Sequence, residues 1–302
     1  MSFLERLDRI DRRWIFLSMG LAVAVPIIVI GITGKTFPEV ATPTTRGAFD
    51  AIQSLPAGSR ILLSFDFDPA SAGELQPMAT AFVRHAAARD LDIYCMTLWA
   101  PAPPLLDETI RKVIVAGHPD LVYGKDYVNL GFQAGNESVL KVICTDFRQS
   151  FSKDYRGTPV DQIPMMAPIK SASDFDCIVT MSAGYPGCKE WVQYIATPAL
   201  GSDDEILLVS GVTGVQAPQM VPYWPRQMRG MLGAIKGAAE YESLVNEFIK
   251  GSNPAADIGP QFMEAQRRMA PQLFGHLLMV GLIILGNCIH FGRRRALAGG
   301  AP

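Results

Sequence analysis

Two carboxylates one residue apart are the side chains whose type and spacing are best suited to chemistry. Asp66 lies near the end of the apolar run at residues 60–67, Asp68 follows that run, and the turn Pro69-Ala70-Ser71 comes next. At the end of a buried strand, such a pair can act as nucleophile and general acid/base beside a divalent cation. The pattern therefore allows a metal-dependent hydrolase of the phosphatase class, with Asp66 as nucleophile, Asp68 as acid/base and Mg²⁺ between them.

This arrangement resembles the first motif of haloacid dehalogenase-type phosphatases, but the chain departs from that family. Thr97 would supply the hydroxyl of the second motif, whereas Ala70 stands where the family carries Thr or Val. The acidic pair Asp203-Asp204 precedes its strand instead of ending one, and no lysine stands where the third motif needs it. Alternatively, the two strand-end carboxylates make a turn and cap a helix by accepting hydrogen bonds from free backbone N–H groups. We favour this alternative.

Other catalytic constellations lack the residues that they need. The stretch between the apolar ends has two histidines, His85 within a predicted helix and His118 after one, which disfavours an imidazole triad or a zinc site. We find no G-x-S-x-G, no Walker A motif, no G-x-G-x-x-G after a strand and no C-x-x-C. Cys188 lies near a lysine and a helix start, where a thiolate could be stabilised, although a plain buried cysteine is favoured. We therefore assign no catalytic residue, metal or cofactor.

The strand ends as a group form a better candidate site. Ligands of doubly wound sheets bind beyond the carboxyl ends of the strands. The residues expected there are polar or glycine, and they are Asp66, Asp68, Ser71, Thr97, Ser182, Gly184, Ser210, Gly211 and Thr213. If the strands are parallel, these residues converge on one edge of the sheet. We expect a polar ligand-binding crevice at that edge.

Strands and helices that alternate along the chain must position these residues. Short apolar runs predict strands, and apolar residues at helical spacing predict helices. The predicted strands are 60–67, 91–99, 127–131, 175–181 and 205–210, and the predicted helices are 72–90, 104–117, 137–147, 186–196 and 226–250. Strands that are apolar on both faces and alternate with helices favour an α/β fold with a mostly parallel, Rossmann-like (doubly wound) sheet.

Two further segments leave alternatives open. In the predicted helix 226–250, Gly230, Gly233 and Gly237 share one face, at a cost of about 1 kcal/mol each relative to alanine. Such a stripe indicates that another backbone approaches closely, either in the domain's own sheet or in a second subunit. The irregular stretch 148–173 contains Met165 and Met166, which either cover a pocket or partner surface or lie in the core.

Both ends of the chain are apolar enough to cross a membrane. Residues 14–34 and 269–292 contain no charged residue, and each meets the length of about 20 residues that a membrane-spanning helix requires. The first run exceeds the roughly 7–15 apolar residues of a signal peptide, which favours an uncleaved anchor. Arginines flank the outer ends of both runs, and the positive-inside bias then places both termini in the cytoplasm. We expect a multi-pass protein of the cell (inner) membrane.

Composition supports this organisation. The chain is 49% hydrophobic and 19% charged, which excludes a disordered chain or a coiled coil. Residues 35–268 carry 20 basic and 26 acidic side chains, which argues against nucleic acid as a partner. The predicted layout is a cytoplasmic N-terminus (1–13), a first span (14–34), a linker (35–47), an extracytoplasmic α/β domain (48–258), a connecting helix (259–268), a second span (269–292) and a cytoplasmic tail (293–302).

Several motifs along the chain together resemble an uncharacterised family of prokaryotic double-pass membrane proteins. The motifs are FDFDPAS, DYVNLGF, the segment 146–151, GTPVDQIPMM, SAGYPGCKEW, APQMVPYW and MLGAIKGAAEYE. The arginine-rich start and the terminal hydrophobic helix belong to the likeness. The resemblance implies an α/β domain between two transmembrane helices, and it implies no particular activity.

Because no catalytic constellation is present, we expect a membrane-anchored module that acts as a ligand-binding or assembly (scaffold) subunit. Its expected partners are the lipid bilayer and either a second copy of the chain, in a homo-oligomer, or other membrane-protein subunits. The alternatives are a membrane-tethered, metal-dependent hydrolase that uses Asp66 and Asp68, and an accessory subunit of a membrane transporter.

Overall fold

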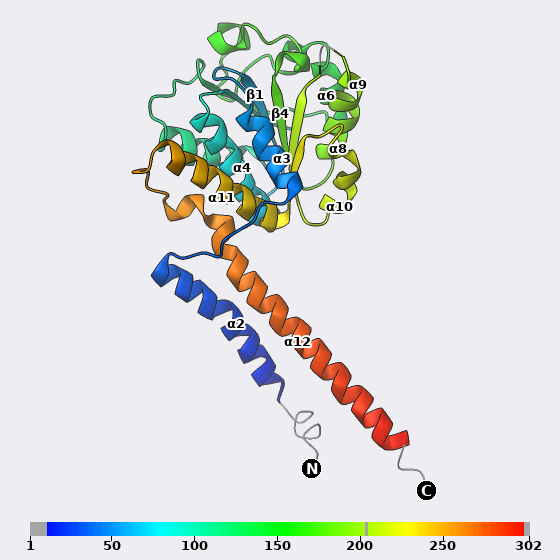
Figure 1. The fold of residues 1–302 in the computed structure, drawn as a ribbon. Helices are drawn as coiled ribbons and strands as arrows, with labels where there is room; N and C mark the ends of the chain where they lie inside the picture. The colour runs from blue at the N-terminus through cyan, green and yellow to red at the C-terminus, as the bar shows by residue number, and fades with distance from the viewer. Residues whose placement is uncertain (1–10, 203–204, 299–302) are drawn as a thin grey trace. The chain divides into compact units, whose positions relative to one another are not determined.

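The computed structural model describes residues 11–202 and 205–298 and divides the chain into two compact units. One unit is an α/β domain of residues 38–266, and the other contains the two terminal apolar segments, up to Phe37 and from Arg267 (Figure 1). The acidic pair at 203–204, the first ten residues and the last four lie outside the described residues, so most of the predicted cytoplasmic N-terminus and part of the tail are not covered.

The domain is built on a six-stranded sheet in which every adjacent pair of strands is parallel. Its strands are β1 (Arg60–Asp66), β2 (Asp92–Thr97), β3 (Tyr127–Phe132), β4 (Cys177–Ser182), β5 (Leu207–Val212) and β6 (Gly230–Gly233). The spatial order is β3-β2-β1-β4-β5-β6, so the direction of winding reverses between β1 and β4. This is the order of a doubly wound sheet, and the predicted α/β class with a parallel sheet is confirmed.

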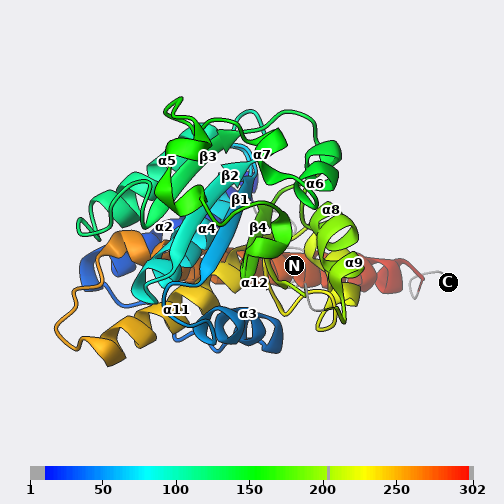
Figure 2. The same ribbon diagram turned by 90° about the horizontal axis from the view of Figure 1, so that it is seen from above.

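Helices cover both faces of this sheet (Figure 2). One face carries α3 (Pro43–Gln53), α4 (Ala72–Ala88), α5 (Pro103–Ile110), which continues as a π-helical turn to Val115, and α11 (Ala234–Ser252). The other face carries α6 (Glu137–Ile143), α8 (Cys188–Trp191) and α9 (Thr197–Ala199), and the short helices α7 (Phe147–Ser150) and α10 (Ala217–Met220) lie in the connections. The predicted helices other than 226–250 correspond to these elements.

Alternation along the strands directs a row of polar side chains toward α8. Successive strand side chains point to opposite faces, and Leu62 and Asp66 of β1 lie on the face that packs against Trp191. Ser64 is therefore on the same face, and the register aligns it with Thr180 of β4 and through Thr180 with Ser210 of β5. The carboxyl half of the sheet thus carries polar groups beneath α8, where apolar residues would be the simpler choice.

The long stretch 148–173 belongs to the core of this second face. It consists of the end of α7 and short 3₁₀ turns, one of which is Pro164–Met166. Met165 and Met166 are both buried, and the Tyr94 hydroxyl donates a hydrogen bond of 2.6 Å to the Met165 carbonyl oxygen. Of the two roles left open for the methionines, the structure supports packing in the core.

The predicted helix 226–250 is wrong in its first part. Gly230–Gly233 forms the edge strand β6, paired with β5, and α11 begins at Ala234. A β-carbon at Gly230 would lie 1.9 Å from the Ala48 nitrogen, and one at Gly237 would lie 2.9 Å from the Leu232 backbone. The glycines therefore allow close approach within the domain, and Gly230, Gly233 and Gly237 share no helix face for a second subunit. A four-residue strand is too short for its alternation to be distinguished from helical spacing.

The boundaries of the domain also differ from the prediction. α3 begins at Pro43, inside the predicted linker 35–47, with the proline in the first turn, where its missing N–H costs nothing. The domain therefore extends from Pro38 instead of residue 48 and runs to Gln266 instead of residue 258. The predicted connecting helix 259–268 starts with a 3₁₀ turn at Pro260–Phe262 and is α-helical only from Glu264.

Two helices are long and apolar enough to cross a membrane. They are α2 (Arg12–Thr33) and the part of α12 (Glu264–Ala298) that ends at Gly292. Most of their apolar side chains are exposed, and Ile32 is one of them. A core helix of a soluble domain would instead bury such side chains.

Replacing Gly230 by alanine should destabilise the domain strongly. The new β-carbon would meet the α3 backbone, which cannot move aside as a flexible side chain can. We expect a loss of about 3 kcal/mol in the free energy of unfolding, measured on the full chain in detergent by urea titration and tryptophan fluorescence. Gly251→Ala in α11 is the control: nothing lies within 4 Å of its β-carbon, and helix propensity predicts a small gain. Equal effects of the two substitutions would contradict the packing described here.

Candidate functional site

The structure brings the polar strand-end residues to the carboxyl edge of the sheet, where the winding reverses. Asp66 at the end of β1 is paired with Ser182 at the end of β4. On the other side of β1, the Thr97 hydroxyl of β2 donates to the Phe65 carbonyl oxygen over 2.6 Å. This is the position at which doubly wound sheets bind ligands, and the arrangement of each side chain decides whether a ligand can reach it.

Asp66 is fully buried, and both of its carboxylate oxygens accept hydrogen bonds from the protein. One oxygen accepts from the Leu98 backbone N–H over 2.8 Å, and the other accepts from the Ser64 hydroxyl over 2.7 Å and from the Trp191 indole N–H over 3.3 Å. Burial raises the pKa of Asp66 to about 6, although these hydrogen bonds oppose the shift. The carboxylate therefore joins β1, β2 and α8 from within the core, where no substrate reaches it.

Asp68 makes the turn between β1 and α4. Its carboxylate accepts a hydrogen bond of 2.9 Å from the Ser71 backbone N–H, one residue before the helix begins at Ala72. The Ser71 side chain makes no capping hydrogen bond of its own. This turn-making role is the one that the sequence analysis favoured for the acidic pair. Asp68 and Asp66 thus act separately, one on a turn and one in the core.

The hydroxyl and glycine residues of the predicted crevice also serve the protein's own structure. The Ser182 hydroxyl accepts from the Cys188 backbone N–H over 3.0 Å at the start of α8, and Ser210 donates to the sulfur of Met228. A β-carbon at Gly211 would lie 2.8 Å from the sulfur of Met78. The Thr213 carbonyl oxygen accepts from backbone N–H groups at the start of the turn into α10. Several residues of the predicted crevice thus make internal contacts, whereas Asp68, Ser71, Gly184 and Thr213 are half-buried. The ligand-binding crevice stays a prediction.

An indole ring covers the point where the winding reverses. Trp99, after β2, donates from its indole N–H to the Pro186 carbonyl oxygen over 2.7 Å. The same ring lies 3.3 Å from the position that a β-carbon at Gly184 would take, and Gln216 donates to the Gly184 carbonyl oxygen over 3.2 Å. The glycine therefore gives Trp99 room to pack closely across the edge. Contact of Gly184 with a ligand stays a prediction.

Apolar side chains instead face outward along this edge. Tyr185 follows β4 and is 57% exposed, and Val215 follows β5 and is 82% exposed. Phe132 at the end of β3 is also exposed, and Trp99 after β2 is half-buried. We call these four residues the apolar rim. The four residues come from the ends of four strands at this edge. Exposed apolar side chains that form a contiguous patch mark binding surfaces.

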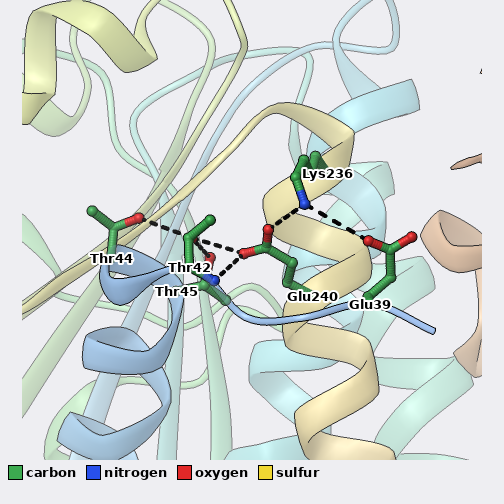
Figure 3. Close-up of polar contacts among 6 residues, drawn as sticks. All are labelled: Glu39, Thr42, Thr44, Thr45, Lys236 and Glu240. Carbon is green, nitrogen blue, oxygen red and sulfur yellow. Dashed lines mark hydrogen bonds and ion pairs between the residues drawn. The ribbon is translucent and has the colours of Figure 1, made fainter. Parts of the chain in front are cut away.

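A second polar arrangement fixes the segment that leads from α2 into the domain, and the sequence analysis missed it (Figure 3). Glu240 of α11 accepts from both the backbone N–H and the hydroxyl of Thr42, over 2.9 and 2.8 Å. Lys236, one turn earlier, donates to Glu240 over 2.6 Å and lies 3.8 Å from Glu39. These hydrogen bonds lower the pKa of Glu240 although the side chain is buried.

A third buried carboxylate fixes the other connection. Glu242 of α11 accepts from the backbone N–H groups of Ala265 and Gln266, each over 3.0 Å, in the first turn of α12. Burial raises the pKa of Glu242 to about 7, and the two backbone donors oppose that shift. Arg84 of α4 stacks on the ring of Phe262 just before this turn, 4.2 Å from its centroid. The carboxylate thus caps the helix that continues into the second apolar segment.

Glu240 and Glu242 lie on different sides of the same helix. Two residues correspond to about 200° around an α-helix, because each residue turns the chain by about 100°. Tyr241 between them is fully buried and donates to or accepts from His85 over 2.7 Å. α11 therefore receives both connections to the terminal segments, and we call Glu240 and Glu242 with their backbone partners the tether junction. Its sequence signal is weak: a Glu-Tyr-Glu triplet in the middle of a largely apolar helix.

The residues set aside as catalytic candidates are structural. Burial lowers the pKa of His85 to about 3, so the ring is neutral and stacks on Phe49. Cys188 is buried against Met228, and burial raises the pKa of its thiol to about 12. The thiolate that a reactive cysteine needs is therefore disfavoured. Within residues 11–202 and 205–298, no group of three or more His, Cys, Asp or Glu side chains is arranged to hold a metal ion.

Comparison with known proteins adds no functional assignment. No protein-family model matches the sequence, and no curated protein or solved structure is significantly similar to it. The resemblance to a family of double-pass membrane proteins therefore stays a prediction. The geometry of the apolar rim and of the tether junction is what a functional proposal must rest on.

Substitution of the fully buried Asp66 should cost more than substitution of the half-buried Asp68. Asp66→Ala leaves the Leu98 N–H and the Trp191 indole N–H without an acceptor and should destabilise the protein by about 3 kcal/mol at pH 7. Asp68→Ala removes one turn hydrogen bond and should cost about 1 kcal/mol. Urea titration of the full chain measures both losses. A similar cost for the two would show that Asp66 is not buried as described.

The cost of Asp66→Ala should also depend on pH. Because folding raises the pKa of Asp66 from 3.8 to about 6, its contribution to stability is complete below pH 4 and is lost as the pH rises through 6. The destabilisation caused by Asp66→Ala is therefore expected to be larger near pH 4 than near pH 7. Other titrating groups, Glu242 included, are common to both proteins and cancel in this difference. A cost that grew with pH would contradict the sign of the shift.

Removing Glu240 should release the segment before α3. In Glu240→Ala the Thr42 amide loses its acceptor, and we expect hydrogen exchange at Thr42 to accelerate and stability to fall by about 1–3 kcal/mol. Glu247→Ala is the matched control, because Glu247 is an exposed glutamate on the same helix that accepts only from Ser243. Exchange mass spectrometry on the full chain reads out the peptide that contains Thr42. Unchanged protection of the Thr42 amide in Glu240→Ala would contradict the hydrogen bond between Thr42 and Glu240.

Proposed function

We propose that this protein is a membrane-anchored, double-pass α/β module that acts as an assembly subunit and uses its apolar rim to recognise a membrane-protein partner, a second copy of the chain included. The proposal rests on the orientation of the side chains at the carboxyl edge of the sheet. The side chains of Asp66 and Ser182 there turn inward and are hydrogen-bonded, whereas those of Tyr185, Val215 and Phe132 are exposed. A catalytic edge needs the reverse arrangement.

The state of the two carboxylates argues for binding over hydrolysis. A nucleophilic Asp66 would need an unshielded oxygen that points to the substrate, but its oxygens accept from β2, from Ser64 and from α8. Asp68 is committed to the turn at Ser71. Asp66 is therefore not in a position to attack a phosphoester, and Asp68 without it lacks the paired carboxylate that the hydrolase mechanism needs.

The anchoring supports a role in an assembly at the membrane. α2 begins at Arg12, and three arginines follow residue 292, so the positive-inside bias favours cytoplasmic termini and an extracytoplasmic domain in the inner membrane. Inside the domain, Glu240 and Glu242 hold both connecting segments on α11. A domain tethered to the membrane through both of its ends stays at a high effective concentration relative to partners in the same membrane.

Site-specific photo-crosslinking in native membranes tests this proposal. A benzoylphenylalanine at Val215 should give a discrete adduct, and the Tyr185→Ala substitution should weaken it by removing part of the rim. The same label at Val122, which is 53% exposed and precedes β3 at the opposite edge, is the control. The adduct mass separates a second copy from another subunit. Equal adducts at both positions, or none at Val215, would refute the proposed rim contact.

The same membranes test the rival activity. Phosphoester hydrolysis that depends on Mg²⁺ or Mn²⁺ and that Asp66→Asn abolishes would overturn the non-catalytic proposal. Because Asp66→Asn also disturbs the core, the loss must occur at a pH and temperature at which circular dichroism shows the variant folded. Asp68→Asn serves as the second variant, since it changes only a turn.

A further inference from the structure

The unit formed by the terminal segments contains an apolar cavity of about 540 Å³. One wall is a stripe on α2 formed by Leu21, Ala22, Val25, Pro26, Val29 and Thr33, and these positions recur at the spacing of one helix face. Phe274 of α12 belongs to the opposite wall. The volume falls within the range of about 300–1,000 Å³ typical of ligand pockets.

The cavity is polar at one end only. The α2 residues that line the cavity are apolar from Leu21 onward, and only the last of them, Thr33, is polar. Lys35, two residues after Thr33, also lines the cavity. The Thr33 hydroxyl donates to the Val29 carbonyl oxygen over 2.8 Å, so it is satisfied within the helix. Lys35 is exposed and forms none of the ion pairs between described residues. The cavity therefore combines a long apolar channel with a single cation at its mouth.

The dimensions of this channel match one leaflet of a bilayer. Twelve residues of α-helix span about 18 Å, and half of the hydrocarbon core of a bilayer measures about 15 Å. Gly34 at the end of α2 adopts a left-handed conformation (φ 64°) and turns the chain away from the helix axis. Lys35 then lies at the depth of the headgroups of the leaflet next to the α/β domain.

We infer that this cavity binds one acyl chain of an anionic phospholipid, with Lys35 at the phosphate of the headgroup. The inference rests on the proposed membrane anchoring. An amphiphile fits this one-sided polarity. Its chain fits the apolar lining, and its charged end fits Lys35, the one cation among the described residues that line the cavity. A helix from a second copy would leave Lys35 without a charged partner, whereas the headgroup of an anionic lipid supplies one.

Photolabelling in lipid nanodiscs tests the inference on the full-length protein. The nanodiscs contain phosphatidylcholine and a minor share of phosphatidylglycerol that carries a photoactivatable acyl chain. We expect the label on the cavity stripe, and Val25→Trp should reduce it severalfold by filling the channel. Ile27→Trp is the matched control, because Ile27 is 53% exposed against 51% for Val25 but does not line the cavity. Uniform labelling around α2, or equal labelling of the two variants, would overturn the inference.

A separate variant tests the contact between Lys35 and the lipid phosphate. Lys35→Gln should lower the preference for phosphatidylglycerol over labelled phosphatidylcholine by about fivefold, which corresponds to about 1 kcal/mol for one lysine near an anionic surface. An unchanged preference would refute the role of Lys35. A change in oligomeric state in Val25→Trp nanodiscs, without loss of lipid label, would assign the cavity to a protein contact and overturn the lipid site.

Failure of this inference is distinguishable from failure of the anchoring. Resistance to alkaline carbonate extraction and the location of both termini are measured on the same preparations. If the protein is extracted by carbonate, the membrane anchoring itself fails and the lipid site fails with it. If the protein is integral but the label does not concentrate on the stripe, only the lipid site is refuted.

Discussion

A buried carboxylate must find hydrogen-bond donors, and in this protein the donors are backbone N–H groups from distant parts of the chain. Asp66 accepts from Leu98, Glu240 accepts from Thr42, and Glu242 accepts from Ala265 and Gln266. Each contact joins an element of the sheet or of α11 to a segment that would otherwise be a connection. The acidic excess of residues 35–268 is thus partly internal, and it is used to hold segments in place.

This use of charge explains why the carboxyl edge of the sheet differs from an active site. A carboxylate that accepts from two strands and an indole is rigid, and burial favours its protonated form. Such a group stabilises the junction of β1, β2 and α8 but offers no free oxygen to a ligand. With the polar groups committed inward, the edge closes under Trp99, and the surface left to partners is apolar. Recognition at this edge then depends on desolvation of aromatic and aliphatic groups.

α11 plays the corresponding part for the terminal segments. It packs on α4 and β6, and its two glutamates hold the entry at Thr42 and the exit at Ala265 on different sides of one helix. Fixing both connections on one rigid element means that displacement of either segment would be opposed by packing of the whole helix. Glu242 titrates near neutral pH, whereas the pKa of Glu240 is lowered by its partners, so the two connections respond differently to acidification.

Much of the fold could be predicted from the sequence. The parallel α/β class and five of the six strands follow from apolar runs that alternate with helical spacing, and the two apolar helices follow from length and the absence of charge. The turn-making role of Asp68 follows as well, since it depends on a contact three residues along the chain. Strand β6 was not predicted, because a four-residue segment with two glycines is too short to show either strand or helix periodicity. Glycines spaced three or four residues apart occur equally in a helix and across a strand-to-helix boundary.

The sequence by itself indicated which residues would lie at the carboxyl edge, because strands that alternate with helices are predicted to be parallel and their carboxyl ends then share one edge. Only the tertiary structure decided which way those residues face and whether their hydrogen bonds are satisfied. The sequence predicts a ligand site at Asp66, Ser182 and Gly184. In the structure each of them contacts a residue outside its own strand: Asp66 accepts from Trp191, Ser182 accepts from Cys188, and Trp99 packs against Gly184. Burial is a property of the packed whole, and periodicity along one segment does not encode the contact that buries it.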